Sequence, residues 1–225
     1  MRNALIVRGG WDGHQPKETS DLFAAFLKNN GFAVTCADTL DAYLDEALMA
    51  KQHLIIHNWT AFGPPDKPEA VKRLCATIAT GVGFAGWHGG MCDAFRTEWN
   101  YHLLSGGQFI AHPPDRRMDY LVEISDRHHP VLAGLDDFMV YNTEQYYMLT
   151  DPGNKVLATT TGYVPGPVLG IQPAAQMPVL WTRAYGYGRV FYSALGHSMA
   201  DFEIRETRTI MERGLLWAAK TEVTA

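Results

Sequence analysis

The stretch GFAGWHGGMCDAF, residues 83–95, decides how the rest of the sequence is interpreted. Its first residues are apolar, as in a buried strand, and three glycines then surround Trp87 and His88. Small residues on both sides of one central side chain are typical of a nucleophile elbow, G-x-Nu-x-G, a sharp strand-to-helix turn that thrusts the central residue out over the sheet. The pattern therefore places His88 where a hydrolase or amidotransferase carries Ser or Cys.

Short apolar runs alternate with helical patterns up to this turn. The runs that we interpret as strands are 4–10, 32–38, 53–59 and 82–88, and the helical segments between them are 16–31, 40–51 and 69–80. In the segment 40–51, the spacing places Leu44, Ala47 and Leu48 inward. Strands and helices that alternate with short connections form right-handed βαβ units. We therefore expect strands near 4–8, 32–36, 53–57 and 82–87 in one parallel sheet, with Gly86–Gly90 as the strand-to-helix turn.

The second half of the chain has a different composition. Residues 101–175 are rich in Gly, Pro, His and Tyr, which predicts an irregular, lid-like segment with short β pieces at 119–125 and 154–160. Residues 177–183 and 189–195 are β-rich runs around a glycine-containing turn and predict a hairpin. A last helix is expected from about 203 to 220. Because no composition break marks a linker, we expect residues 1–225 to form a single domain.

Composition excludes several classes of function. The net charge is -5 and no cluster of Lys and Arg offers a basic face to phosphates, which argues against nucleic acid. Neither a membrane span nor a signal peptide is visible, so no membrane partner is expected. Cys36, Cys75 and Cys92 are odd in number and form no CxxC pair, which fits a reducing compartment. We expect a cytoplasmic protein.

Aromatic and imidazole side chains gather at the predicted strand ends. The residues concerned are Trp11, His14, His57, Trp59, Trp87 and His88. Ligands of open parallel sheets bind outside the carboxyl ends of the strands, and tryptophan rings stack on the apolar faces of sugars. The three tryptophans therefore predict a sugar platform. His14 is either a group of the site or a solvated loop residue, and His57 is as readily a buried structural residue.

Two further candidates lie in the second half of the chain. Glu144 sits among tyrosines, which suits either an acid/base with a raised pKa or a hydrogen-bond anchor for its loop. His197 follows the predicted hairpin and should reach the same sheet edge as His88. We predict that His88, Glu144 and His197 converge on one pocket walled by Trp87 and Tyr146. His14 is expected at its rim, whereas His112, His128 and His129 are interpreted as loop residues.

A metal ion is a further hypothesis. His14, His88, Glu144 and His197 supply enough nitrogen and oxygen ligands for a zinc-like divalent ion with an open position. No HExxH or other local ligand pair exists, so only the fold could assemble this set. No cofactor is firmly implied. Cys92 is not expected to be a nucleophile, because it lies four residues beyond the centre of the turn.

The sequence resembles the ThuA-like, or trehalose-utilisation, proteins of the class I glutamine amidotransferase-like superfamily. The motifs that carry the resemblance are GWHGG (86–90), YNTEQYY (141–147), AYGYGRVFYSALGH (184–197) and, more loosely, VRGGWDGH (7–14). The resemblance implies a flavodoxin-like three-layer sandwich with a mostly parallel central sheet, in which His88 replaces the amidotransferase Cys. It also implies a link with carbohydrate metabolism, particularly with keto-sugars made by a partner sugar dehydrogenase.

Three functions remain open from the sequence. The first is an enzyme that acts on a keto-sugar or keto-glycoside by acid/base isomerisation, elimination and hydration, or hydrolysis. The second is a non-catalytic carbohydrate-binding or regulatory module that has lost the nucleophilic Cys. The third is a surviving Cys hydrolase, which requires Cys92 beside a His at the turn. In each case the expected partner is a small sugar, and a homo-oligomer is left open.

Overall fold

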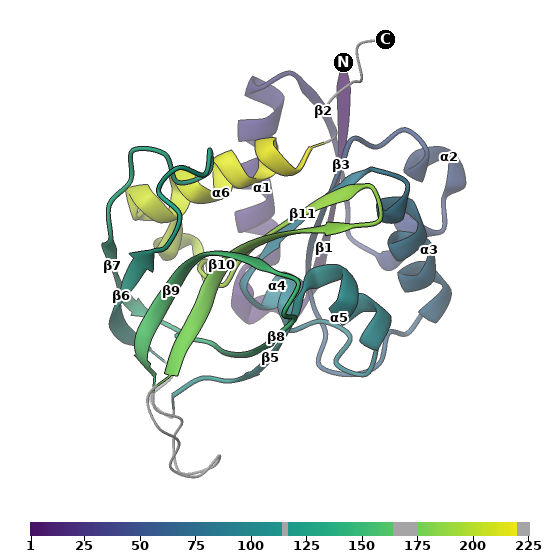
Figure 1. The fold of residues 1–225 in the computed structure, drawn as a ribbon. Coiled ribbons are helices and arrows are strands. Elements are labelled where there is room, and N and C mark those ends of the chain that lie inside the picture. Colours follow the sequence, from purple (N-terminus) through teal and green to yellow (C-terminus); the bar gives the residue numbers. More distant parts are fainter. Residues whose placement is uncertain (114–116, 164–174, 220–225) are drawn as a thin grey trace.

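The computed structural model describes residues 1–113, 117–163 and 175–219, which form an α/β fold around one large mixed sheet (Figure 1). In the described part of the chain, this nine-stranded sheet has the order β2-β1-β3-β4-β11-β10-β9-β6-β7. The strands are β1 (Arg2–Gly10), β2 (Phe32–Ala37), β3 (Leu54–Thr60), β4 (Gly83–Trp87), β6 (Met118–Ile124), β7 (Phe138–Thr143), β9 (Lys155–Tyr163), β10 (Ala175–Tyr185) and β11 (Gly188–Ser193). A separate pair consists of β5 (Gly107–Ala111) and β8 (Tyr147–Thr150).

The first half of the sheet is parallel, which confirms the expected strand set. β1 pairs in parallel with both β2 and β3, β3 pairs with β4, and β4 pairs with β11. All five residues of β4 are buried, as expected of a strand covered on both faces. β4 is therefore an interior strand, and its carboxyl end opens between those of β3 and β11.

Helices cover both faces of this parallel part. Side chains alternate between the two faces of a strand, so residues 83 and 87 of β4 share one face. Gly83 lies against the end of α6 (Arg205–Ala218), and Trp87 contacts Phe23 of α1 (Pro16–Asn29). Phe84, of opposite parity, packs against Tyr101 of α5 (Trp99–Ser105), and α5 in turn contacts α3 (Pro68–Ala79). Helices α1 and α6 thus lie on one face, and α3 and α5 lie on the other (Figure 1).

The second half of the sheet corrects the expectation of a mostly parallel arrangement. The predicted hairpin forms between β10 and β11, and a turn as short as 186–187 can join only antiparallel strands. The pairs β10–β9, β9–β6 and β6–β7 are antiparallel as well. In the segment 101–175, the β pieces expected at 119–125 and 154–160 are confirmed as β6 and β9. The rest, expected to be irregular, contributes most of α5, the strands β5, β7 and β8 and the first residue of β10, while 114–116 and 164–174 lie outside the described residues.

The single helix expected over 40–51 is divided in two. A 3-10 helix, η2, spans Leu40–Tyr43, and a short α2 spans Glu46–Met49. Asp45 divides them because its carboxylate accepts a hydrogen bond from the backbone N–H of Leu48 at 2.9 Å, as an N-cap does. Leu44 is consequently exposed, and the residues buried here are Leu40, Tyr43 and Met49. By contrast, α6 closely matches the last predicted helix.

Candidate functional site

The turn after β4 places His88 in a strained conformation. β4 ends at Trp87, and the short helix α4 (His88–Cys92) begins at His88 with a φ of 46°. This left-handed conformation costs a non-glycine residue about 1–3 kcal/mol and is found mostly where function requires it. The side chain is 1% exposed. His88 therefore occupies the centre of an elbow-like turn but is buried beneath other side chains rather than open to solvent.

The glycines after His88 make room for neighbours on two sides. A Cβ at Gly89 would lie 2.3 Å from Cε1 of His14 and 3.0 Å from the hydroxyl of Tyr146. A Cβ at Gly90 would lie 2.2 Å from Oδ1 of Asn58, whose amide donates hydrogen bonds to residues of α1. The glycines are needed because two other elements touch the backbone of the turn.

His88, Glu144 and His197 meet above this turn. The Nε2 atom of His88 lies 3.1 Å from Oε2 of Glu144, and Nδ1 of His197 lies 3.3 Å from both of these atoms. The other ring nitrogen of His88, Nδ1, donates to the carbonyl of Ala194 at 2.8 Å. The loop after β7 delivers Glu144 and the loop after β11 delivers His197. Three segments that are far apart in the sequence thus meet within hydrogen-bond distance.

His14 completes a group of four. It ends the 3-10 helix η1 (Asp12–His14) after β1, and its Nδ1 lies 2.7 Å from Oγ1 of Thr60 at the end of β3. Its ring centroid is 4.8 Å from that of His88 and 5.2 Å from that of His197. One ligand-type atom from each of the four side chains lies within 4.8 Å of the others. His14 therefore belongs to the cluster itself, closer than the rim position expected.

The electrostatics of the cluster differ from the expectation for Glu144. Burial opposes its ionisation, but hydrogen bonds and positive charge from His197 and His88 outweigh that cost and hold the pKa of Glu144 well below its usual range. Burial, together with the neighbouring imidazoles, lowers the pKa of His14 to about 2. The cluster thus holds a carboxylate that is ionised and a His14 that is neutral at physiological pH.

Aromatic residues surround the cluster at one side. The ring of Tyr146 lies 3.9 Å from that of His88, centroid to centroid, and Tyr146 is buried. Trp11 packs edge-on against His14 at 4.7 Å and is 43% exposed. Phe62, also exposed, lies 6.1 Å from Trp11. Trp11 and Phe62 therefore form an accessible aromatic rim next to His14.

One of the three expected platform tryptophans, Trp87, lies in the core. Trp87 is 1% exposed and packs between Phe23 and Phe202, because its position in β4 points to the α1 face. It belongs to the core and does not wall a pocket at the cluster. Trp59 lays its ring over Gly9, where a Cβ would lie 2.6 Å from it. Trp11 is the exposed tryptophan in contact with His14.

His57 is a core residue. It is fully buried, lies 2.7 Å from the Tyr43 hydroxyl through Nδ1, and packs near Phe95 and Tyr101. Burial lowers the pKa of His57 to about 3. Among the alternatives weighed for this residue, the structure favours the structural one.

Sequence reasoning missed three polar residues near the cluster. His112, interpreted as a loop residue, places Nε2 4.0 Å from Oε1 of Glu144. Arg117 places Nη2 3.4 Å from Nε2 of His197. Thr60 holds His14, as described above. Thr60 could have been found, since it directly follows the predicted strand 53–59. Nothing in the local pattern distinguishes His112 or Arg117.

The cysteines lie away from this chemistry. Cys92 is 1% exposed, and burial raises the pKa of its thiol well above the usual range, with Tyr192 and Ser105 as its hydrogen-bond partners. Burial also raises the pKa of Cys75 to about 11. The thiolate required of a nucleophile is therefore scarce at neutral pH.

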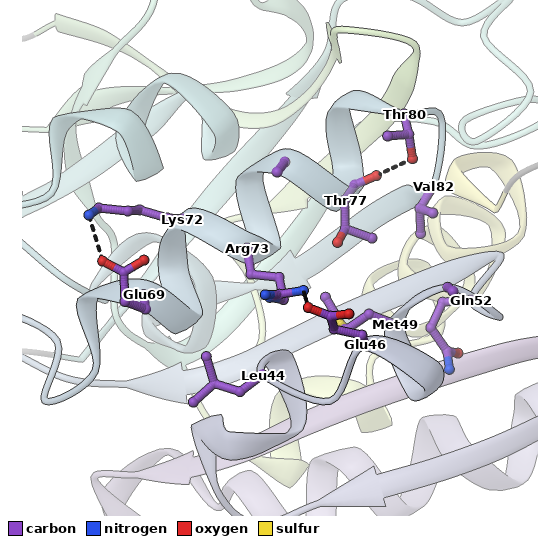
Figure 2. Close-up of a pocket in the computed structure, with 12 residues that line it drawn as sticks. Leu44, Glu46, Met49, Gln52, Glu69, Lys72, Arg73, Thr77, Thr80 and Val82 are labelled. Carbon is purple, nitrogen blue, oxygen red and sulfur yellow. Dashed lines mark hydrogen bonds and ion pairs between the residues drawn. The ribbon is translucent and has the colours of Figure 1, made fainter.

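A surface groove lies elsewhere in the molecule. It has a volume of about 660 Å³ and runs between α2 and α3 (Figure 2). Its charged side chains pair with one another, Arg73 with Glu46 and Lys72 with Glu69. Exposed, mutually neutralised pairs of this kind offer little to a ligand. The groove carries no functional assignment.

The fold and site together define a class of protein. It is an α/β protein of flavodoxin-like fold in which a strand-to-helix turn presents a histidine to a buried carboxylate. Within the described residues, no helix is long and apolar enough to cross a membrane.

The chain belongs to the ThuA family, described as trehalose utilisation, whose model matches residues 3–218. No curated protein matches the chain. Among solved structures, it is similar to a putative ThuA-like protein from Parabacteroides merdae, with a TM-score of 0.77, 19% identity and coverage of 100% of this chain and 92% of that one. A putative ThuA-like protein from Bacteroides uniformis has a TM-score of 0.75 and 19% identity, with coverage of 96% of this chain and 91% of that one. A β-galactosidase from Bacillus circulans has a TM-score of 0.58 and 14% identity, with coverage of 96% of this chain and 30% of that one. At these identities the similarity establishes the fold.

Proposed function

We propose that this protein is an enzyme of carbohydrate metabolism that removes a proton from the carbon next to the ketone of a keto-sugar or keto-glycoside. The observation that carries the proposal is the contact of Glu144 Oε2 with both His88 Nε2 and His197 Nδ1, at 3.1 and 3.3 Å. The family's description, trehalose utilisation, points to the carbohydrate class. Proton removal is the step shared by isomerisation and elimination, so it is the step that the site has to supply.

The reaction needs a base and a group that stabilises the enolate oxygen. Arg117 can only donate, so its contact with Nε2 of His197 leaves the ring proton on Nδ1, facing Glu144. His88 donates from Nδ1 to Ala194, and in its protonated form it also donates from Nε2. These two imidazoles are the donors that a developing enolate oxygen would use.

Glu144 is the base in this scheme. Its pKa is held low by the hydrogen bonds of His197 and His88, in spite of burial. A ketone oxygen that takes over those hydrogen bonds would leave the buried carboxylate without them, and desolvation would then raise its pKa. Substrate binding itself would thus make Glu144 a stronger base at the moment when the proton is removed.

The aromatic rim accounts for sugar binding. Trp11 and Phe62 present exposed rings next to His14, and the apolar face of a pyranose stacks on such rings while its hydroxyl groups face polar atoms. In this proposal the other side of the sugar meets His112 and Arg117, which lie next to Glu144 and His197. We place the keto-sugar between these two sides, supplied by a dehydrogenase that oxidises the parent glycoside.

The proposal is tested by incubating the purified protein with a panel of 3-keto-glucosides and their parent disaccharides and by following the products by NMR. Conversion of a keto compound, and of no parent compound, is the expected result. Glu144→Gln should abolish it, because an amide cannot accept the proton, whereas His128→Ala, a change at an exposed histidine, should leave it unchanged. Equal conversion by the wild type and Glu144→Gln would contradict the proposal.

A binding module without catalysis is the second candidate. The observation in its favour is that His14, His88, Glu144 and His197 are all buried, with exposures of 1–7%, so that the cluster lies beneath the surface. The same panel separates the two functions. A module would bind a keto-sugar at equilibrium and return it unchanged.

A further inference from the structure

The ring nitrogens of the cluster raise a question of proton placement. Because His88 donates from Nδ1 to Ala194, the neutral ring turns the lone pair of Nε2 toward Oε2 of Glu144, 3.1 Å away. Two lone pairs at this distance repel each other unless a proton or a cation lies between them. The cluster therefore calls for positive charge at its centre.

In His14, too, Nδ1 has a hydrogen-bond partner, and if Nδ1 carries the proton it donates it to the hydroxyl oxygen of Thr60. Nδ1 of His14 is engaged by Thr60, which leaves Nε2 as the nitrogen free for the cluster. Histidines that bind metals are typically oriented in this way, with one ring nitrogen held by an oxygen and the other directed to the ion. Here a backbone carbonyl holds His88 and a hydroxyl holds His14.

The distances fit a tetrahedral ion. Ligand atoms at about 2.0–2.1 Å from a tetrahedral zinc ion lie roughly 3.3–3.4 Å from one another. The three distances among His88 Nε2, His197 Nδ1 and Glu144 Oε2 are 3.1, 3.3 and 3.3 Å. The atom of His14 lies within 4.8 Å of the rest, close enough to close the set with a small movement of its ring.

We infer that His14, His88, His197 and Glu144 form a binding site for a divalent transition-metal ion of the zinc type. Three imidazoles and one carboxylate are ligands that such ions accept, and all four side chains are buried. A neutral His197 that binds through Nδ1 carries its proton on Nε2, so Arg117 must move away when the ion binds.

The ion also fits the proposed function, on which this step alone rests. A bound ion would supply Lewis-acid stabilisation of the enolate oxygen, in place of the imidazole N–H groups, if the ketone oxygen took the position of His14, the most distant of the four ligands. Glu144 binds through Oε2, and its Oε1, on the side of His112, is left to accept the proton. The metal site itself requires no substrate and is tested without one.

The test measures metal on the full-length protein in the absence of sugar. Zn²⁺ and Co²⁺ are titrated calorimetrically into chelator-treated protein, and the visible absorption of bound Co²⁺ reports tetrahedral geometry. We expect one equivalent of either ion in the wild type and in His128→Ala. His14→Ala and His88→Ala should weaken binding by more than about 100-fold, and Thr60→Val by about 10- to 100-fold, because Thr60 only orients a ligand.

Circular dichroism shows whether each variant is folded. If His88→Ala does not fold, His14→Ala and Thr60→Val still decide the matter, since they leave the turn intact. Less than one tenth of an equivalent in the wild type, or equal binding by the wild type and His14→Ala, would overturn the inference. Neither result would contradict the proposed function, which is tested separately by keto-sugar conversion.

Discussion

His88 concentrates the unusual features of the chain at the scale of one residue. It has a left-handed φ of 46°, follows a fully buried strand and contacts both Glu144 and His197. A strained, buried imidazole costs free energy in both respects, and such costs persist where function maintains them.

The first prediction concerns His88 itself. His88→Ala should lower the turnover of the keto-sugar by roughly 10²- to 10⁴-fold, the usual contribution of a positioned acid/base group. The substitution takes a hydrogen-bond partner from the buried Ala194 carbonyl and Glu144 carboxylate, so we expect a folded variant of reduced stability. Steady-state kinetics checks the rate, and thermal unfolding checks the fold. An unchanged turnover in folded His88→Ala would remove His88 from the mechanism.

The second prediction concerns the glycine that touches His14. A Cβ at Gly89 would lie 2.3 Å from Cε1 of His14, so Gly89→Ala must displace that ring. We expect a loss of about 1–3 kcal/mol in the free energy of unfolding, the usual cost of overpacking, together with a loss of turnover. Gly63→Ala is the matched control, since a Cβ there meets nothing within 4 Å. Equal effects of the two substitutions, measured by urea unfolding, would refute this packing argument.

At the scale of the elements, sequence patterns predicted the parallel strands well and the segment 101–175 poorly. β1, β2, β3 and β4 are continuous apolar runs ended by turn residues, so their identity and pairing follow from composition and connection length. The β pieces expected at 119–125 and 154–160 are found as β6 and β9, whereas β5, β7 and β8 lie among glycines, prolines and polar residues, and β5 pairs with the distant β8. No local pattern could predict that pairing.

The same division applies to the site. His14, His88 and His197 could be predicted because each follows a strand, and parallel strands end at one sheet edge. His112 and Arg117 reach the cluster from the loop before β6, where no periodicity fixes a direction. Trp87 was wrongly placed at the site, because a position at the end of a strand does not reveal toward which face of the sheet the side chain points.

The third prediction tests the division of the segment 40–51. Asp45→Ala removes the hydrogen bond to the backbone of Leu48 and should cost about 0.5–2 kcal/mol in the free energy of unfolding. Asp45→Asn keeps an oxygen in the same place and should cost less. Chemical unfolding of both variants checks the order. If Asp45→Ala were as stable as the wild type, Asp45 would not explain the break between η2 and α2.

At the scale of the whole molecule, stability should depend on pH through buried histidines. The pKa of His57 is about 3 in the folded protein because the ring is fully buried, against about 6.5 when unfolded. The folded state therefore binds fewer protons, and stability present above pH 6.5 is lost as the pH falls toward 3. The protonation of His57 alone should lower the free energy of unfolding by about 2 kcal/mol between pH 7 and pH 5.

The fourth prediction follows from this linkage. His57→Gln should be less stable than the wild type at pH 7, because it disturbs the contact with Tyr43, but should lose about 2 kcal/mol less on going to pH 5. Urea unfolding at the two pH values shows how steeply the free energy of unfolding of each protein changes with pH. Parallel slopes for the wild type and His57→Gln would mean that His57 is protonated in the folded state.

The whole molecule brings four distant segments to one sheet edge, and the central claim is that a proton is removed from a keto-sugar there. The most direct measurement is deuterium incorporation from D₂O into the carbon next to the ketone of a 3-keto-glucoside, followed by NMR with the purified protein. The account predicts exchange at that carbon with the wild type, and none above the enzyme-free rate with Glu144→Gln. Binding of the keto-sugar by the wild type without any enzyme-dependent exchange would contradict it.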